Sequence, residues 1–340
     1  MDLDRLSAWL HGGFGEPPTL RTAPGHGPLH AELIAGGRSN LTYLVGDGEQ
    51  EWVLRRPPLG HVLATAHDMG REYRVMSALQ PTEVPVPRML AFCADTDVLG
   101  APFYLMERVT GAPFRRREEL LALGETRTRA ISERLVDTLA VLRAIDPNTV
   151  GLKDFGRPEG FLGRQVERWR RQLEASHSRD LPAAVALHDA LTADVPGESS
   201  AGIVHGDFRL DNVLIDAGDR PAAVIDWEMA TLGDPVTDLA LMIVYQRLAG
   251  LLGALVSDAS LAPGYLSEPE TLQRYTRTGG AEVPRFGWYL ALASYKLAAI
   301  VEGIHFRHIN GKTVGPGFEL AGSAVQPLLE AGLAAVREDP

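Results

Sequence analysis

The sequence predicts an α+β fold with two lobes, a small N-terminal lobe around an antiparallel sheet and a larger, mostly helical C-terminal lobe. The chain has 340 residues, more than one hydrophobic core usually serves. Residues 31–56 contain short apolar runs separated by turn residues, whereas beyond Gly111 apolar residues recur at three- and four-residue spacing. We therefore expect an N-terminal lobe at 1–106, a hinge at 107–112 and a C-terminal lobe at 113–340.

Residues 31–56 are expected to form strands around a glycine-containing loop. In this loop, Gly36 and Gly37 let the backbone approach phosphate oxygens closely, and Ser39 and Asn40 can donate further hydrogen bonds. Such a loop alone is more often an ordinary tight turn, but it precedes a hairpin whose turn, Asp47-Gly48, is a strong signal. The expected strands are 32–35, 41–45 and 52–55.

An arginine and a glutamate are expected to pair in this lobe. Arg55 lies on the strand at 52–55, and Arg56 alternates to the other face of the sheet, where we expect it to be solvated. Glu72 lies in an expected helix at 68–79, in the middle of the face made by Met69, Met76 and Leu79. A buried carboxylate without a cation is costly, so Glu72 would pair with Arg55. Alternatively, Glu72 lies at the edge of that face and reaches water.

The composition excludes several kinds of site. Lysine occurs only at positions 153, 296 and 312, which excludes a P-loop of the Walker type and requires any phosphate-binding cation in the N-terminal half to be arginine. Cys93 is the only cysteine, so there is no internal disulfide or cysteine zinc site, and we expect a cytoplasmic location. The net charge of −11 argues against a nucleic-acid partner. No segment has the ~20 apolar residues of a membrane span, and no signal peptide is recognisable at the start.

The remaining elements are expected to be mostly helical. Residues 102–109 should form a strand that runs into the connector between the lobes. A later helix begins at Asp234-Pro235, with Asp234 as N-cap. Further helices are expected at 128–145, 161–173 and 288–304; the second carries a basic stripe, Arg164, Arg168 and Arg171, which is either a solvated face or a contact for an anionic substrate.

One segment carries recognisable chemistry. It reads His205-Gly206-Asp207-Phe208-Arg209-Leu210-Asp211-Asn212 and is followed by Ile225-Asp226-Trp227-Glu228. Apolar runs at 202–204, 213–215 and 222–225 read as strands, so the polar side chains lie where strands end. Phosphoryl transfer with Mg²⁺ needs this set: Asp207 to orient an attacking hydroxyl, and Asn212 with Asp226 to hold the metal. Each piece alone is more often structural, but all three occur in order and at the right spacing.

These motifs resemble the aminoglycoside phosphotransferase and choline kinase family, small-molecule kinases with a protein-kinase-like fold. Its loop reads His-Gly-Asp-x-x-x-x-Asn, and its metal aspartate lies in an Ile-Asp-Trp-Glu type of stretch. The resemblance covers about Gly36 to Gly311. It implies ATP and Mg²⁺ as cofactors, contact of Arg55 with the α- and β-phosphates, and hydrogen bonds from the backbone of Glu107 to Val109 to the adenine edge.

The resemblance also implies supporting residues. Asp238, one turn into the helix at 234, would brace the catalytic loop, although it could merely complement the helix dipole. Glu228 could reach a second metal through water or bind substrate. His205 and Arg307 are candidates for a supporting or substrate-binding role. Arg55 replaces the usual kinase lysine, and its planar fork is not interchangeable with an ammonium group.

The segment Tyr-Lys-Leu-Ala…Glu-Gly…Arg…Gly at 295–311 resembles a branch of the family found fused to acyl-CoA dehydrogenase domains. That branch implies a hydroxyacyl acceptor. The main prediction is therefore an ATP-dependent phosphotransferase that acts on a hydroxyl of a small molecule. Two alternatives stay open, a nucleotide-binding pseudokinase without catalysis and an antibiotic kinase that acts on aminoglycosides or macrolides. The sequence predicts neither the acceptor's charge, nor a preference for ATP over GTP, nor the oligomeric state.

Overall fold

The computed structural model describes residues 1–13, 27–34, 40–58, 68–176, 178–197, 201–253, 256–279, 282–313 and 317–338. It forms two compact units, one of Met1–Gly111 with Ala222–Ala230 and one of Ala112–Pro221 with Thr231–Pro340. The segment Ala222–Ala230 therefore packs with the N-terminal residues, although it follows the His-Gly-Asp loop in sequence. A sheet unit and a mostly helical unit confirm the predicted α+β class. The expected lobe and hinge boundaries stay predictions.

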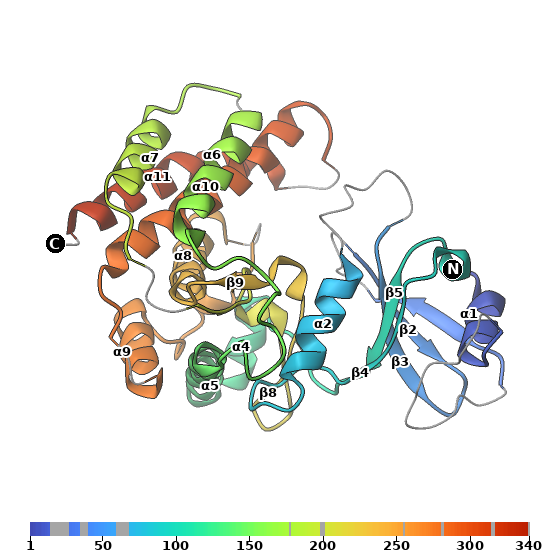
Figure 1. Cartoon of the computed structure of the whole chain (residues 1–340). Coiled ribbons are helices and arrows are strands. Elements are labelled where there is room, and N and C mark those ends of the chain that lie inside the picture. Colours follow the sequence, from blue (N-terminus) through green and yellow to red (C-terminus); the bar gives the residue numbers. More distant parts are fainter. Residues whose placement is uncertain are drawn as a thin grey trace. The chain divides into compact units, whose positions relative to one another are not determined.

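Antiparallel strands in the order β1-β2-β3-β5-β4 form the sheet of the first unit (Figure 1). The predicted Asp47-Gly48 turn joins β2 to β3. Gly48 has a φ of +91°, and Asp47 Oδ1 accepts the N–H groups of Glu49 and Gln50 at 2.9 and 2.8 Å. The strands are β1 His30–Leu33, β2 Leu41–Gly46, β3 Glu51–Arg56, β4 Met89–Cys93 and β5 Phe103–Glu107, so β1 begins two residues before the predicted range.

Helices cover both faces of this sheet (Figure 1). Helix α2 (Met69–Leu79) lies on one face and begins at Asp68, whose side chain caps the helix by accepting the N–H of Arg71. Helices α1 (Leu3–Leu10) and α3 (Thr96–Leu99) pack on the other face over a buried apolar cluster. In that cluster the Trp9 and Phe103 rings meet edge to face at 4.9 Å.

The prediction that Arg56 is solvated was wrong. Its side chain is 3 % exposed, because α1 and α3 cover the face of the sheet that Arg56 shares with Trp52 and Leu54. The guanidinium instead donates from Nη1 to the carbonyl of Leu99 at 2.8 Å and from Nε to that of Pro57 at 3.2 Å. Strand alternation gave the correct face, but it could not reveal what covers that face.

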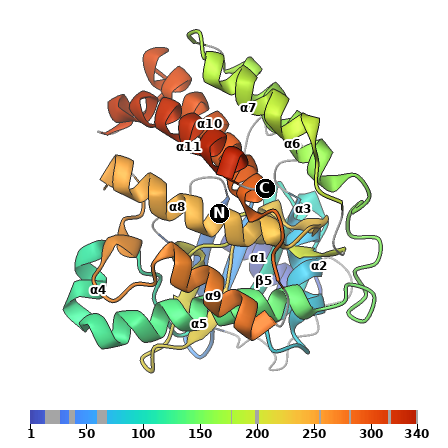
Figure 2. The ribbon, with the colours of Figure 1, turned by 90° about the vertical axis from the view of Figure 1, so that its left-hand side faces the viewer.

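The second unit is built around helix α10 (Phe286–Ile309). This helix packs against α11, α8, α6 and α7, and Figure 2 shows α10 and α11 lying side by side. Most of its residues are buried, as expected of a helix that is apolar on nearly all sides. The other helices are α4 Arg117–Leu123, α5 Glu125–Ala144, α6 Phe161–Ala175, α7 Pro182–Ala193, α8 Val236–Leu252, α9 Glu268–Gly279 and α11 Ala321–Glu338.

The predicted helices at 128–145, 161–173 and 288–304 are confirmed as α5, α6 and α10, each with somewhat different ends. Helix α8 begins at Val236 with Pro235 in the cap position, and Asp234 Oδ1 accepts the N–H of Val236 at 3.0 Å. The helix thus begins one residue later than predicted, and Asp234 lies just before the cap residue and not at it. No helix in the described part of the chain is both long and apolar enough to cross a bilayer.

Short strands and 3₁₀ turns frame the predicted catalytic segments. Strand β6 pairs antiparallel with β9, with Val204 opposite Thr231. The strands are β6 Gly202–Val204, β7 Val213–Ile215, β8 Pro221–Val224 and β9 Thr231–Gly233, and the 3₁₀ turns are η1 Leu210–Asn212, η2 Trp227–Met229, η4 Ala259–Leu261 and η5 Phe318–Leu320. The predicted strands at 202–204, 213–215 and 222–225 are therefore confirmed, the last with shifted ends.

Candidate active site

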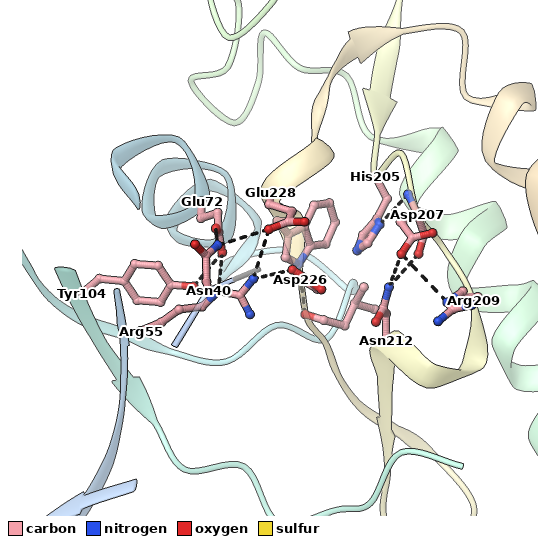
Figure 3. Close-up of polar contacts among 12 residues, drawn as sticks. Asn40, Arg55, Glu72, Tyr104, His205, Asp207, Arg209, Asn212, Asp226 and Glu228 are labelled. Atoms are coloured by element: carbon pink, nitrogen blue, oxygen red, sulfur yellow. Dashed lines mark hydrogen bonds and ion pairs between the residues drawn. The ribbon is translucent and has the colours of Figure 1, made fainter. Parts of the chain in front are cut away.

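In the second unit, the side chain of Asp207 is held at both carboxylate oxygens, and Figure 3 shows the contact with Asn212. Asn212 Nδ2 donates to Asp207 Oδ2 and to the Asp207 carbonyl, each at 2.9 Å. The Tyr245 hydroxyl donates to Asp207 Oδ1 at 2.7 Å. The Asp207 side chain nevertheless remains 29 % exposed. A carboxylate oxygen can accept more than one hydrogen bond, so Asp207 is fixed in orientation and still accessible to a hydroxyl group.

The backbone of this loop is braced by two charged side chains, a buried one and a half-buried one. Asp238 accepts the N–H groups of His205 and Gly206 at 2.7 and 2.8 Å, which confirms the predicted bracing geometry. Lys296 Nζ donates to the Gly206 carbonyl at 2.6 Å. Burial raises the pKa of Asp238 and lowers that of Lys296, and in each case the neighbouring opposite charges favour the ionised form. The loop is therefore held by charge-assisted hydrogen bonds, which are stronger than neutral ones.

His205 lies inside the loop and not on its surface. It is fully buried, and its ring meets the Phe208 ring edge to face at 5.9 Å. The N–H of Asp207 donates to His205 Nδ1 at 3.2 Å, so Nδ1 acts as an acceptor. These contacts suit the supporting role that was one of the two options for His205, since a buried ring does not reach a substrate.

In the first unit, Arg55 lies among three carboxylates (Figure 3). Its Nε is 3.1 Å from Glu72 Oε2, and its Nη2 contacts Asp226 Oδ1 and lies 3.7 Å from Glu228 Oε2. Asn40 Nδ2 links two of these acids, with 3.1 Å to Glu72 Oε1 and 3.2 Å to Glu228 Oε2. The predicted pair of Arg55 and Glu72 is confirmed, and the alternative in which Glu72 reaches water is wrong, because Glu72 is only 1 % exposed.

Burial dominates the electrostatics of Glu72. It raises the pKa of Glu72 to about 7, although Arg55 and the hydrogen bond from Tyr104 oppose the shift. Tyr104 OH donates to Glu72 Oε2 at 2.8 Å. Burial also acts to lower the pKa of Arg55, but Tyr104 and the surrounding acids outweigh it and raise that pKa, so Arg55 stays charged.

Asp226 has an unusual backbone. It precedes η2 with φ 66° and ψ 57°, the left-handed conformation that side-chain-bearing residues seldom adopt. The Trp227 indole N–H, buried beside it, donates to the Val224 carbonyl at 3.0 Å and anchors the turn. Strained backbone of this kind concentrates at functional sites. The Asp226 side chain is 32 % exposed, so a ligand can reach it.

The two predicted metal ligands belong to different units, Asn212 to the second and Asp226 to the first. Asn212 uses its Nδ2 for Asp207, which leaves its Oδ1 outside these hydrogen bonds. An amide oxygen and a carboxylate are the kinds of donor that Mg²⁺ prefers, with phosphate oxygens completing its shell, so the donor chemistry fits. Among the residues that the structure describes, no group of three or more His, Cys, Asp or Glu side chains is arranged to hold a metal ion.

The other predicted site residues are less constrained. Gly36, Gly37 and Ser39 lie outside the described residues. The Glu107 N–H donates to the Arg88 carbonyl at 2.9 Å, so this N–H is already engaged and does not face a ligand. Arg307 is exposed on α10.

The basic stripe is only partly a solvated face. Arg164 donates to the backbone carbonyls of Arg157 and Glu159, just before its helix. Arg168 is exposed, with its guanidinium 5.0 Å from the centre of the Trp169 ring. Arg171 is exposed.

Sequence reasoning missed Tyr245 and Lys296 as site residues. A signal existed for each. Tyr245 follows Asp238 by seven residues, two helical turns, and so shares its face of α8. Lys296 is one of three lysines in the chain and lies within a nearly continuous apolar helix, where an unpaired ammonium group would be costly.

Comparison with known proteins agrees with this geometry. The sequence profile of the phosphotransferase enzyme family matches residues 30–272. The human protein named acyl-CoA dehydrogenase family member 11 is 34 % identical over 342 residues, which cover 98 % of this chain and 43 % of that protein. The chain thus spans less than half the length of this relative, and the predicted resemblance to the branch found with acyl-CoA dehydrogenases is confirmed.

Solved structures give the same fold. A Ralstonia eutropha protein described as a candidate aminoglycoside phosphotransferase shares 30 % identity and a TM-score of 0.85 over 100 % of this chain and 99 % of its own. A thermostable mutant of aminoglycoside phosphotransferase APH(4)-Ia, in ternary complex with AMP-PNP and hygromycin B, has a TM-score of 0.61 at 18 % identity, covering 90 % of this chain and 93 % of its own. With its loop, its fold and its sequence in agreement, the chain belongs to the phosphotransferase enzyme family.

Proposed function

We propose that this protein transfers the γ-phosphoryl group of ATP to a hydroxyl group of a small molecule with Mg²⁺ as cofactor. The observation that carries the proposal is the state of Asp207 in the His-Gly-Asp loop, where two neutral donors orient the carboxylate and leave it accessible. Phosphoryl transfer depends mainly on positioning and electrostatics, so a pre-oriented carboxylate is the feature it needs.

In the proposed reaction, Asp207 accepts the hydrogen bond of the acceptor hydroxyl and then its proton. The hydroxyl oxygen forms a bond to the γ-phosphorus as the bond from that phosphorus to the leaving oxygen of ADP breaks. Asn212 and Asp226 would hold Mg²⁺, which when bound neutralises charge on the phosphates. Asp238 and Lys296 keep the loop in place without touching the reacting atoms.

Arg55 would bind the nucleotide phosphates in place of the usual lysine. In the structure its guanidinium is already engaged by Glu72 and Asp226. Binding MgATP would then exchange partners, with Arg55 turning from Asp226 to phosphate oxygens while Glu72 continues to orient it. The fork of an arginine suits this exchange, because separate nitrogens can hold Glu72 and a phosphate at once. Asn40 and the backbone of Glu107 and Val109 are further proposed nucleotide contacts.

We propose a hydroxyacyl compound as acceptor, in line with the similarity to a protein named as an acyl-CoA dehydrogenase. An aminoglycoside or macrolide acceptor remains the second candidate, since solved relatives carry those names. A pseudokinase is a third reading, favoured by the ion pair between Arg55 and Asp226, which occupies both groups that a nucleotide complex would need. A cytoplasmic location remains a prediction.

A two-part experiment tests the proposal. Thermal-shift titration with MgATP and with metal-free ATP should show stabilisation that requires Mg²⁺, because a ligand that binds only the folded state raises its stability. Release of ADP should then be measured over a panel of hydroxyacyl thioesters, hydroxylated metabolites and antibiotics. Binding of MgATP without ADP release on any acceptor, or with water, would favour the pseudokinase. No response to MgATP in either part would remove the proposal altogether.

A further inference from the structure

Tyr245 holds the carboxylate of Asp207 from helix α8, through the 2.7 Å hydrogen bond from its hydroxyl to Oδ1. We propose that Tyr245 is a positioning residue for phosphoryl transfer, which fixes the orientation from which Asp207 meets the acceptor hydroxyl. The inference rests on the proposed function, since it needs Asp207 to be the residue that meets the acceptor.

One helix fixes both the backbone of the loop and its key side chain. Asp238, in the first turn of α8, binds the N–H groups of His205 and Gly206. Tyr245, two turns further along the same face, binds the side chain of Asp207. A site held by a single rigid helix is more accurately positioned than one held by loops. Asp238 thus positions the backbone of the loop, and Tyr245 positions the side chain of Asp207.

The ring of Tyr245 is itself held in place. The Arg209 guanidinium lies 4.7 Å from its centre, a cation–π contact. Arg209 is fixed in turn by Asp211, with Nη2 at 2.9 Å from Oδ2. Tyr245 also lines a small pocket together with Gln246, Ser257 and Tyr265. With its ring clamped in this way, the hydroxyl points at Asp207 Oδ1 in a defined direction.

The chemistry of the contact suits positioning. Burial raises the pKa of Tyr245 well above its ordinary value, so the hydroxyl keeps its proton and acts as a donor. A neutral donor orients a carboxylate without neutralising it. Asp207 Oδ1 and Oδ2 each hold one such donor, and a carboxylate offers about four acceptor positions in all, so room remains for an acceptor hydroxyl.

The test is Tyr245→Phe, which removes the hydroxyl and keeps the ring for Arg209. Tyr275→Phe is the control, because the ring of Tyr275 also lies under a guanidinium, that of Arg143 at 5.5 Å, but its hydroxyl makes no hydrogen bond to a carboxylate. Turnover is measured as ADP release from MgATP with water as acceptor, and affinity as the Kd of Mg·AMP-PNP by calorimetry. Tyr245→Phe should lower turnover about tenfold and leave that Kd unchanged, while Tyr275→Phe changes neither.

The same variant in an Asp207→Ala background should cause no further loss, because Tyr245 acts only through that carboxylate. Wild-type turnover in Tyr245→Phe, or a parallel loss of turnover and of nucleotide affinity, would overturn the proposal while Asp207→Ala stays inactive. If instead Asp207→Ala hydrolyses ATP as fast as the wild type, the proposed function itself fails, which is a distinguishable result.

Discussion

The two units hold their key side chains in opposite ways. In the first, Arg55 is surrounded by the carboxylates of Glu72, Asp226 and Glu228, so its positive charge is paired. In the second, Asp207 is held by an amide and a phenol, both neutral, and Arg209 Nε lies 3.9 Å away, at the limit of an ion pair. A ligand at Arg55 must therefore replace an existing ion pair, whereas a hydroxyl at Asp207 need only be added.

This difference separates two tasks. The carboxylate of Asp207 is pre-organised, so its loss should affect the rate of the reaction more than the stability of the fold. The cluster around Arg55 is partly buried and holds three acids beside one cation, so changes there should affect the stability of the fold and the dependence of that stability on pH. A mutation at Asp207 that mainly lowered stability, or one near Arg55 that left stability unchanged, would contradict this distinction.

The largest effect is expected from Asp207→Ala, which should lower turnover at least ~100-fold, in line with the loss of a positioned proton acceptor. Its effect on stability should be small, because the side chain is partly exposed and its donors can bind water. ADP release and urea unfolding measure the two quantities. Asp216→Ala, which removes an acid from a surface turn at Gly218 and Arg220, is the control and should keep the wild-type rate. Unchanged turnover in Asp207→Ala would show that this carboxylate does not determine the rate of the reaction.

Asp238→Ala should be the most destabilising of these changes. It leaves the N–H groups of His205 and Gly206 buried without their acceptor, at a cost of about 3 kcal/mol in the free energy of unfolding. It should also lower turnover, because the loop loses its brace. Urea denaturation provides the measurement, with Asp189→Ala as the control, since that side chain is 74 % exposed and should contribute under ~0.5 kcal/mol. A stability loss no larger than that of the control would mean that the brace is not structural.

The sequence predicted those site residues that a local pattern of polar and apolar residues marks. The loop around Asp207 was recognisable because its polar residues stand close together between apolar runs, and Glu72 because helical spacing put it among Met69, Met76 and Leu79. The contacts that it did not predict join residues that are far apart in the sequence. The sequence signals for Tyr245 and Lys296, helical spacing and a cation in an apolar helix, do not identify the loop atoms that these side chains contact.

The same limit explains the error at Arg56 and the unexpected place of segment 222–230. Alternation along β3 assigned Arg56 to a face, but the covering helices α1 and α3 come from elsewhere in the chain. In the same way, nothing local in Ile225-Asp226-Trp227-Glu228 indicates that it packs with the N-terminal residues. Side-chain spacing predicts elements and faces, whereas partners across long sequence separations require the assembled structure.

A pH-dependent effect is expected from Glu72→Gln. Because the pKa of Glu72 is raised from 4.5 to about 7 in the folded state, the folded protein binds more protons than the unfolded chain between these values. The contribution of Glu72 is therefore fully present below pH ~4.5 and is lost as the pH rises through about 7. The stability of the wild type relative to Glu72→Gln should fall across this window, by about 1.4 kcal/mol for each pKa unit at most. Urea unfolding at a series of pH values measures this, and a constant difference would show that the ion pair with Arg55 overrides burial.

The smallest effect, and the sharpest test of the charged cluster, is expected from Tyr104→Phe. This change removes the donor to Glu72 Oε2 and should cost about 1 kcal/mol of stability. Hydrogen bonds to ionised groups contribute more than those to neutral ones, so the cost should be larger above pH 7, where Glu72 is ionised, than at pH 5. In a Glu72→Gln background that pH dependence should disappear, since no carboxylate is left to titrate. Tyr73→Phe, whose ring packs 5.5 Å from that of Phe92, supplies a control in which the cost is independent of pH. If the cost of Tyr104→Phe were independent of pH, as in this control, the Tyr104 hydroxyl would not be stabilising the charge of Glu72. The contact would then be no more charge-dependent than the ones that neutral donors make at Asp207, and the contrast between the two units would fail.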